Sequence, residues 1–490
     1  MGCDPRDELA ELDALLECLR LKRYDLKRKI NRHHSPIVRQ LPPDVKSTIF
    51  EFCLPDFAKF SSYYTEKELS ISLSLEAICS YWRDIAWSTP SLWSSMVLHV
   101  PSIHDSHIVT GIAKEWLSPS GYLPLFIRIF SRYKTKTLSR LADIINQHST
   151  RWSNLDLDMP GYYFQRFHAT NNHAPILKFI RFHCSKPSIN FQLLNCPRLE
   201  RACLSSITLF GSDIQWDNLT HLNLNSMLII DSLLILSMTP RLVFCDISSA
   251  WLGNTRQLDI GAPVVTSLRS LQLLNVSSVN SFLNNIIAPC LEEFSLPNFY
   301  NPSMEVMTSF FRRSGCSLRS ISMGFHNFPP HFEKFIIFFQ PMNTLSITEA
   351  RSYSDNTNPE DYDLRNILHL VAKVLSSQSA SPQQGFLPNL KILKYTGKLR
   401  LPAGNLDDLY SLPPATVHGS LHLFKLDLHP ITRIPKNMIS YFSSLEERGV
   451  TVNVLSESED ILHSSIVYYR RREESLFRDW ADNFDSSLFS

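Results

Sequence analysis

Two pairs of closely spaced carboxylates come nearest to a spacing that could support acid–base chemistry. Asp156 and Asp158 lie two positions apart, so in a strand they would share one exposed face. Glu292 and Glu293 are adjacent, so in a strand they would point to opposite faces. Paired carboxylates catalyse a reaction only where a pocket brings them to a substrate. No recognisable pocket motif surrounds either pair, so the sequence supports no catalytic residue.

Histidine and cysteine side chains between residues 183 and 203 come close enough in sequence to be considered as a metal site. The group consists of His183, Cys184, Cys196 and Cys203. Zinc sites use tight pairs such as C-x-x-C or H-x-x-x-H, which these spacings do not match, and strand or turn positions explain them better. The chain also has only 14 glycines and no glycine-rich phosphate-binding motif. We therefore expect no metal, no cofactor and no enzyme activity.

Length and composition indicate a folded, elongated or multidomain protein. The chain has 490 residues, of which 44% are hydrophobic and 19% charged, and this is too long for one compact core. The net charge of +1 gives no reason to expect nucleic acid or an anionic membrane as a partner. No apolar run reaches the roughly 18 residues of a membrane span. Ten cysteines without a C-x-x-C pair suggest reduced thiols, and hence the cytosol or nucleus.

The first element that the pattern predicts is a charged amphipathic helix over residues 6–33. Its apolar residues alternate at steps of three and four, which is the spacing of a coiled-coil seam, with Arg23 as the one charged member. Weak self-association through 9–30 is one interpretation, and packing against the chain's own domain is the other. The short length and Arg23 favour packing. The seam residues are Leu9, Leu12, Leu16, Leu19, Leu26 and Ile30.

Residues 38–97 predict a module of three short helices. The first begins at Pro42-Pro43, because proline is favoured in a first turn, and it places Val45, Ile49 and Phe52 on one face. The second carries apolar residues at helical spacing from 75 to 86. The third begins at Thr89-Pro90, a cap followed by a first-turn proline. A unit of this size buries little surface, so an apolar groove on it would be a natural place for a partner.

The order and spacing of these residues resemble an F-box, and in particular the large F-box set of mushroom-forming fungi. The matching positions are Leu41, Pro42, Asp44, Val45, Ile49, Phe50, Ile78, Cys79, Trp82, Arg83, Ile85, Ala86, Leu92 and Trp93. The middle of the box, residues 53–74, is longer and more polar than is usual. The resemblance implies docking on the Skp-type adaptor of cullin–RING ubiquitin ligases. The contacts that it implies come from Leu41, Pro42, Val45, Ile49, Phe50, Ile78, Trp82, Ile85, Leu92 and Trp93.

A repeated L-x-x-L-x-L pattern over residues 120–455 predicts parallel strands separated by helices or turns, as in leucine-rich repeats. From 199 onwards the first positions are spaced by 20, 23, 26, 23, 27 and 24 residues, and the step of 48 to Leu390 is interpreted as two periods. The predicted fold class is α/β, a helical F-box module followed by a leucine-rich-repeat-like solenoid with a curved parallel sheet. The ten candidate strands lie at 152–157, 177–182, 199–204, 219–224, 242–247, 268–273, 291–296, 318–323, 342–347 and 390–395.

Two further segments complete the predicted organisation. Residues 351–388 are interpreted as a loop, a helix near 364–375 and a second loop inserted into the array. Residues 449–454 alternate like a closing strand, and a charged tail follows over 456–490.

The residues between the repeated leucines are expected to line the concave face of the sheet, because side chains alternate along a strand. Each is more simply a solvated polar side chain, but together they form the expected target-binding face. These residues are Arg201, His221, Asn223, Asn225, Asp246, Gln272 and Glu293.

Three functions are compatible with this organisation. The first is a non-catalytic adaptor subunit that binds a Skp-type adaptor and an unknown target protein. The second is a leucine-rich-repeat scaffold unconnected with ubiquitin. The third, an enzyme with an undetected site, is weakest because the glycine-rich motifs are missing.

Overall fold

A computed structural model describes most of the chain as two compact units. One unit comprises Met1–Ala202 with Ser206–Gln215, and the other comprises Cys203–Ser205 with Trp216–Ser490. The residues described are 5–34, 40–54, 71–101, 106–169, 173–184, 192–193, 195–207, 213–253, 262–297, 303–325, 332–336, 339–349, 364–377, 386–397, 420–428, 431 and 433–487. Over these ranges the protein is mixed α/β, with 13 α-helices and a 15-stranded, mostly parallel sheet.

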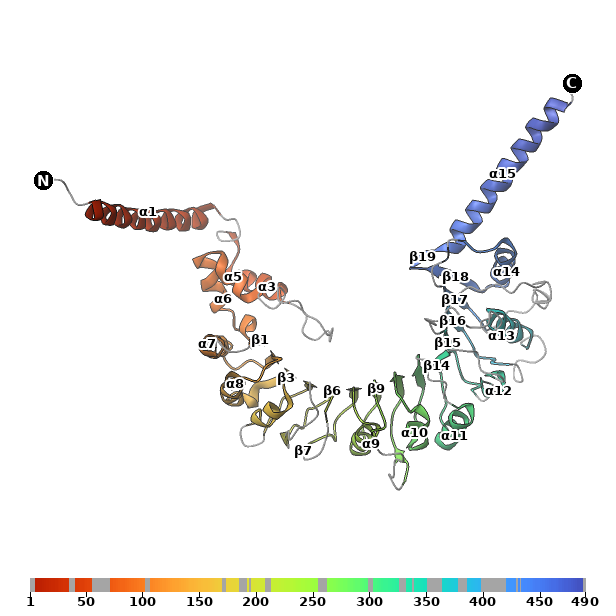
Figure 1. Cartoon of the computed structure of the whole chain (residues 1–490), viewed down its shortest axis with the longest axis horizontal. Helices are drawn as coiled ribbons and strands as arrows, with labels where there is room; N and C mark the ends of the chain where they lie inside the picture. The colour runs from red at the N-terminus through yellow and green to blue at the C-terminus, as the bar shows by residue number, and fades with distance from the viewer. Residues whose placement is uncertain are drawn as a thin grey trace. The chain divides into compact units, whose positions relative to one another are not determined.

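The first unit begins with helices and continues into parallel strands (Figure 1). Strands β1 to β4 pair in parallel and in chain order, which requires a crossover connection between each pair. The elements are α1 (Pro5–His34), α3 (Pro43–Phe52), α5 (Ile71–Ile78), α6 (Ser80–Trp87), the 3-10 helix η1 (Pro90–Trp93), β1 (Ser95–His99), α7 (Ser106–Leu117), β2 (Leu125–Phe130), α8 (Lys136–Asn146), the 3-10 helix η2 (Ser149–Arg151), β3 (Trp152–Asp158), the 3-10 helix η3 (Gly161–Arg166), β4 (Phe179–His183), β5 (Gln192–Leu193) and β7 (Asp213–Ile214).

The second unit repeats a strand and a crossover, and its strands follow the order β8-β9-β11-β13-β14-β15-β16-β17-β18-β19. All of these pairings are parallel except the antiparallel pair of β18 and β19. The elements are β8 (His221–Asn225), α9 (Ile229–Met238), β9 (Phe244–Ser248), β10 (Val264–Val265), β11 (Ser270–Leu274), α10 (Val279–Asn284), β12 (Ile286–Ile287), β13 (Glu293–Leu296), α11 (Met304–Ser314), β14 (Ser320–Phe325), α12 (Phe332–Ile336), β15 (Thr344–Glu349), α13 (Leu364–Ser377), β16 (Ile392–Gly397), β17 (Leu423–Leu428), α14 (Lys436–Glu446), β18 (Thr451–Ser456), β19 (Glu459–Asp460) and α15 (Ile461–Ser487). Strand β6 (Arg201–Ser205) is divided between the two units.

The core lies between the strands and the helices that connect them. In β8, Leu222 and Leu224 are buried, while the residues that alternate with them are partly exposed. The parallel register places Leu222 beside Cys245 of β9, so the buried side chains form continuous rows from strand to strand. Each fully buried leucine of this kind contributes about 1.5–3 kcal/mol.

A left-handed residue follows each of four successive strands of the sheet, β6, β8, β9 and β11. The residues are Ser206, Ser226, Ser249 and Asn275, with φ between 50° and 56°. This conformation costs a non-glycine residue about 1 kcal/mol. It lets the N–H of Ser226 donate to the carbonyl of Ser248 at 2.9 Å, and the N–H of Ser249 donate to that of Leu274 at 2.8 Å. The turns therefore share one backbone geometry although their sequences differ.

Each of the ten predicted repeat segments contains a strand. Most strands begin two residues after the first leucine of the pattern, as β8 does after Leu219. The interpretation of the 48-residue step as two periods is wrong, because Thr344 of β15 pairs directly with Ile392 of β16. The helix near 364–375 is confirmed as α13, whereas the two loops predicted beside it lie mostly outside the described residues. The closing strand is confirmed as β18, and β1, β2 and β17 were not predicted.

The predicted module of three helices differs in two places. The helix expected over 75–86 is interrupted at Cys79, which is extended and whose sulfur accepts the N–H of Trp82 at 3.5 Å, so α5 and α6 are separate helices. The third helix is the 3-10 helix η1, and Thr89 does not cap it. Its hydroxyl donates instead to the Ile85 carbonyl at 2.7 Å.

Candidate partner-binding surfaces

Four residues that the sequence assigned to adaptor contact lie in the core of the helical module. Phe50, Ile85, Leu92 and Trp93 are all buried. Phe50 packs on the ring of Trp82 at 4.9 Å, and the Trp93 indole N–H donates to the Ala86 carbonyl at 2.7 Å. The burial of these four residues does not support direct partner contact in this conformation, and that assignment stays a prediction. They hold the module together, because their spacing places them on the faces where α3, α6 and η1 meet.

Helix α3 exposes its most apolar face. Val45 and Ile49 are 42% and 38% exposed, and Phe52 is 86% exposed. The buried face carries Lys46, whose ammonium donates to the Tyr81 hydroxyl at 2.7 Å and lies 4.8 Å from the centre of that ring. A helix that served only its own module would bury the apolar stripe and expose the lysine. The prediction that Val45, Ile49 and Phe52 share a face is confirmed.

The other expected contact residues of the module are accessible to different degrees. Pro42 and Ile78 are exposed, and Leu41 and Trp82 are half-buried. Trp87, which was not predicted, is 41% exposed, and its indole N–H donates to Glu76 at 2.8 Å. Exposed apolar side chains therefore occur on α3, at the end of α5 and at the end of α6.

Helix α1 exposes its entire coiled-coil seam. The prediction that this helix packs its seam against its own domain is wrong for the residues described, because each seam side chain is at least 53% exposed. Helix α1 contacts the module outside the seam, where the Arg28 guanidinium donates to the Ser80 hydroxyl at 3.0 Å.

The polar face of the second unit carries the residues expected to contact a target. Asn223, Asp246 and Gln272 lie side by side on β8, β9 and β11, and the Asn223 amide donates to Asp246 at 3.1 Å. Burial raises the pKa of Asp246. A neighbouring row runs from His221 through Phe244, on which the imidazole stacks at 4.6 Å, to the exposed Glu293 and on to Ser320. Asn225 begins a third row, and Arg201 is exposed on β6.

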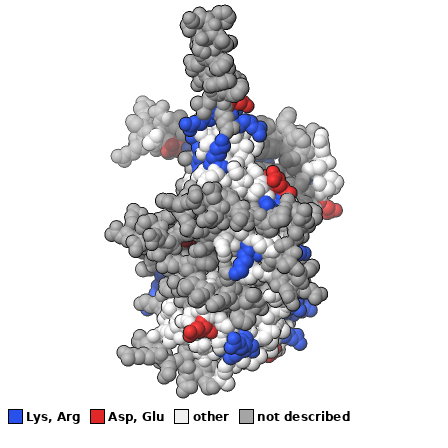
Figure 2. Space-filling view, turned by 90° about the vertical axis from the view of Figure 1, so that its right-hand side faces the viewer, with Lys and Arg blue, Asp and Glu red and all other residues white. Residues whose placement is uncertain are grey.

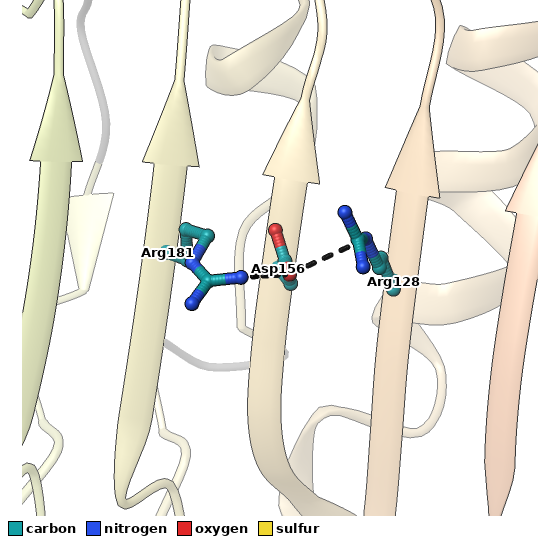
Figure 3. Close-up of polar contacts among 3 residues, drawn as sticks. All are labelled: Arg128, Asp156 and Arg181. Carbon is teal, nitrogen blue, oxygen red and sulfur yellow. Dashed lines mark hydrogen bonds and ion pairs between the residues drawn. The ribbon is translucent and has the colours of Figure 1, made fainter. Parts of the chain in front are cut away.

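The polar face of the first unit holds an ionic cluster that the sequence did not predict. Asp156 of β3 lies between Arg128 of β2 and Arg181 of β4, with N–O distances of 3.5 and 3.3 Å (Figure 3). The Asp156 carboxylate is 3% exposed. Burial raises its pKa, and the two guanidinium groups oppose that rise. Asp156 and Asp158 share a face, as expected, but that face buries Asp156.

Basic side chains gather around the beginning of α15 (Figure 2). Arg470, Arg471 and Arg472 are exposed in the first half of α15, and the Arg433 guanidinium lies 3.6 Å from the centre of the Tyr468 ring. The sequence marks this surface by its run of three arginines, although none was among the predicted site residues.

The residues considered for chemistry do not assemble into a reactive site. His183 is exposed while Cys184 is buried, and burial raises the pKa of the Cys196 thiol to about 12. Such a thiol stays protonated and is a poor nucleophile or ligand. Within the described ranges, no three His, Cys, Asp or Glu side chains come together as a group that could hold a metal ion.

Comparison with known proteins does not assign the chain to a family. No protein-family model matches the chain, and no curated protein matches it. None of the helices in the described part of the chain has a stretch long and apolar enough to cross a membrane.

Proposed function

We propose that this chain is the substrate-recognition adaptor of a cullin–RING ubiquitin ligase. Its F-box-like helical module docks on a Skp-type adaptor, and its strand array, a leucine-rich-repeat-like solenoid with a curved sheet, binds the target protein. The observation that supports this most strongly is the orientation of α3, with Val45, Ile49 and Phe52 outside and Lys46 inside.

An exposed apolar helix face is the pattern of a surface that a partner covers. The side chains of Val45, Ile49 and Phe52 recur at i, i+4 and i+7, which are the anchor positions of helix-in-groove recognition. Phe50 and Trp93 behind them are buried and hold α3 in place. Full burial of a side chain of this size contributes about 1.5–3 kcal/mol, so covering the exposed parts of Val45 and Ile49 would contribute less than this for each, and covering Phe52 would contribute most of it.

The strand array supplies the second half of the proposed function. Its polar rows present amide, carboxylate and imidazole groups side by side, as at Asn223, Asp246 and His221. Such a face recognises a protein by hydrogen bonds, while the buried leucines behind it keep the strands in register. Ubiquitin transfer would come from other subunits, and this chain would contribute proximity alone. The cytosol or nucleus is the proposed compartment.

The test is co-purification of the full chain with a Skp-type adaptor, using two single variants of α3. Ile49→Glu places a charge on the apolar face, and Thr48→Glu places the same charge on an exposed polar position one residue earlier. We expect Ile49→Glu to weaken adaptor binding more than about tenfold, as is typical of an interface anchor. Thr48→Glu should bind as the wild type does.

Both variants should keep the wild-type circular dichroism spectrum, because neither position is buried. If the wild-type chain is folded and does not bind the adaptor, the ubiquitin-ligase proposal fails. The chain would then be a repeat scaffold whose helical module caps the strand array. If Ile49→Glu and Thr48→Glu bind equally well, the α3 face is not the docking surface.

A further inference from the structure

The seam of α1 is a coiled-coil surface that none of the described residues covers. Its side chains occupy alternating a and d positions over about three heptads, and each is between 53% and 60% exposed. The residues are Leu9, Leu12, Leu16, Leu19, Leu26 and Ile30. From Leu9 to Ile30 the seam is about 32 Å long. Water-exposed apolar stripes of this length mark an interaction surface.

The contact between α1 and the helical module of residues 40–93 leaves this seam accessible. Tyr24 and Arg28 line a cavity with Ile78 and Ser80, and the Arg28 Nε donates to the Ser80 hydroxyl at 3.0 Å. With Arg23 at an a position, Tyr24 and Arg28 fall at b and f, away from the seam, while Lys27, which also lines the cavity, falls at an e position beside it. The helix therefore contacts the module with one side and presents its leucines on the other.

The charges of α1 divide into two halves of opposite sign. Residues 5–19 hold five acidic residues and one basic residue, a net charge of −4. Residues 20–34 hold seven basic residues and one acidic residue, a net charge of +6 with neutral histidines. The helix dipole favours this polarity only within the first and last turns. Asp13, Glu17, Arg20 and Arg23 lie in the middle of the helix, away from its first and last turns, so the dipole does not explain why their charges are divided.

We propose that two copies of this chain associate through α1 as an antiparallel coiled coil, with Leu9 of one copy beside Leu26 of the other and Leu16 beside Leu19. This inference is independent of the ubiquitin-ligase proposal, because it uses only the α1 seam and its charges.

Charge complementarity sets the direction of the two helices. A parallel pair would place the −4 half beside another −4 half and the +6 half beside another +6 half. An antiparallel pair brings each acidic half against a basic half. In the stated register, Asp13 and Arg20 both occupy e positions and face each other across the pair. Arg23, the one charged seam residue, packs opposite Leu12, next to the partner copy's Asp13. The antiparallel arrangement thus compensates the charge that weakens the seam.

The first experiment measures the mass of the full chain by sedimentation velocity over a range of protein concentrations. We expect the mass to rise from that of the 56.3 kDa chain towards twice that value. Leu19→Glu charges the seam and should abolish the rise. Leu21→Glu is the matched control, since Leu21 is 63% exposed but lies off the seam, and it should associate as the wild type does. A wild-type chain that stays monomeric throughout, or equal effects of the two variants, would overturn the proposal.

The second experiment determines the direction of the helices. Leu9→Cys and Leu26→Cys are introduced into separate chains that also carry Cys18→Ser, because Cys18 is exposed on the same helix. A short bis-maleimide should link the two chains when they are mixed and should link neither chain alone. The Cys18→Ser chain alone gives the background from the remaining thiols. Linking of each chain to itself, without linking in the mixture, would show a parallel pair and refute the antiparallel proposal.

Discussion

Removing the carboxylate between Arg128 and Arg181 should loosen the first unit locally. Asp156 lies 3.5 and 3.3 Å from the two guanidinium groups, whose side chains are 16% and 21% exposed. At an effective dielectric of about 20, each attraction amounts to about 5 kcal/mol before the cost of desolvation. Breaking a buried ion pair costs about 3–5 kcal/mol, because the remaining charge stays buried without its partner. Both arginines keep some contact with water, so we expect Asp156→Ala to cost about 3 kcal/mol.

Hydrogen exchange is the assay that resolves this effect, since a chain of two units need not unfold in one transition. Backbone amides of β2, β3 and β4 in Asp156→Ala should exchange more than about 100-fold faster than in the wild type. Asp158→Ala is the control on the same strand and face, where the side chain is only half-buried, and it should change exchange by about twofold.

A second variant separates lost attraction from damaged packing. Replacing Arg128, Asp156 and Arg181 together by Met, Leu and Met removes all three charges, and buried ionic clusters replaced in this way often lose no stability. We therefore expect the triple variant to exchange more slowly than Asp156→Ala. Unchanged protection in Asp156→Ala, or equal loss in both variants, would refute the reasoning.

Three further predictions concern other parts of the fold. Burial raises the pKa of Asp231, whose Oδ2 has no hydrogen-bond partner among the described residues, so the native state binds a proton more readily than the unfolded state. Stability should therefore fall as pH rises from the ordinary carboxyl range of about 4 through that raised pKa, and Asp231→Asn should abolish this slope in urea denaturation measured at several pH values. Trp93→Ala should destabilise the helical module by about 3–5 kcal/mol, whereas Phe52→Ser, at a side chain 86% exposed, should leave its thermal melting unchanged. Gly397→Ala should cost about 1–3 kcal/mol by the same melting measurement, because a Cβ at residue 397 would meet the Tyr395 hydroxyl at 2.5 Å and Glu349 at 2.6 Å.

The strand array could be predicted from the sequence because one pattern recurs in it. Apolar residues at alternate positions of a strand share one face, which must be buried. The recurrence of this pattern predicts further strands that pair with the first, so β8, β9 and β11 follow from Leu222, Cys245 and Leu271. The step from β15 to β16 was misjudged because spacing alone cannot distinguish one long crossover from two short ones.

The contact surfaces were harder to predict, because both faces of a short helix can carry apolar residues. In α3, Phe50 lies on one face and Ile49 on the other, and contacts with Trp82 and Tyr81 decide which is buried. The ionic cluster around Asp156 was missed for a related reason. Its partners lie 28 residues before it and 25 residues after it, and only the strand register brings them together.

The left-handed residues that follow successive strands have a consequence for how such a chain can change in length. Ser226 and Ser249 have nearly the same φ and are 23 residues apart. Excising residues 226–248 would therefore join Asn225 directly to Ser249. The backbone of Ser249 has nearly the same φ as that of Ser226, the residue that follows Asn225 in the present chain. Strand β8 would then pair with β11, with Leu222 beside Leu271 and Asn223 beside Gln272. An ancestral chain could gain or lose whole units of one strand and one crossover, which would change the neighbours of each recognition residue while the buried leucines stayed aligned.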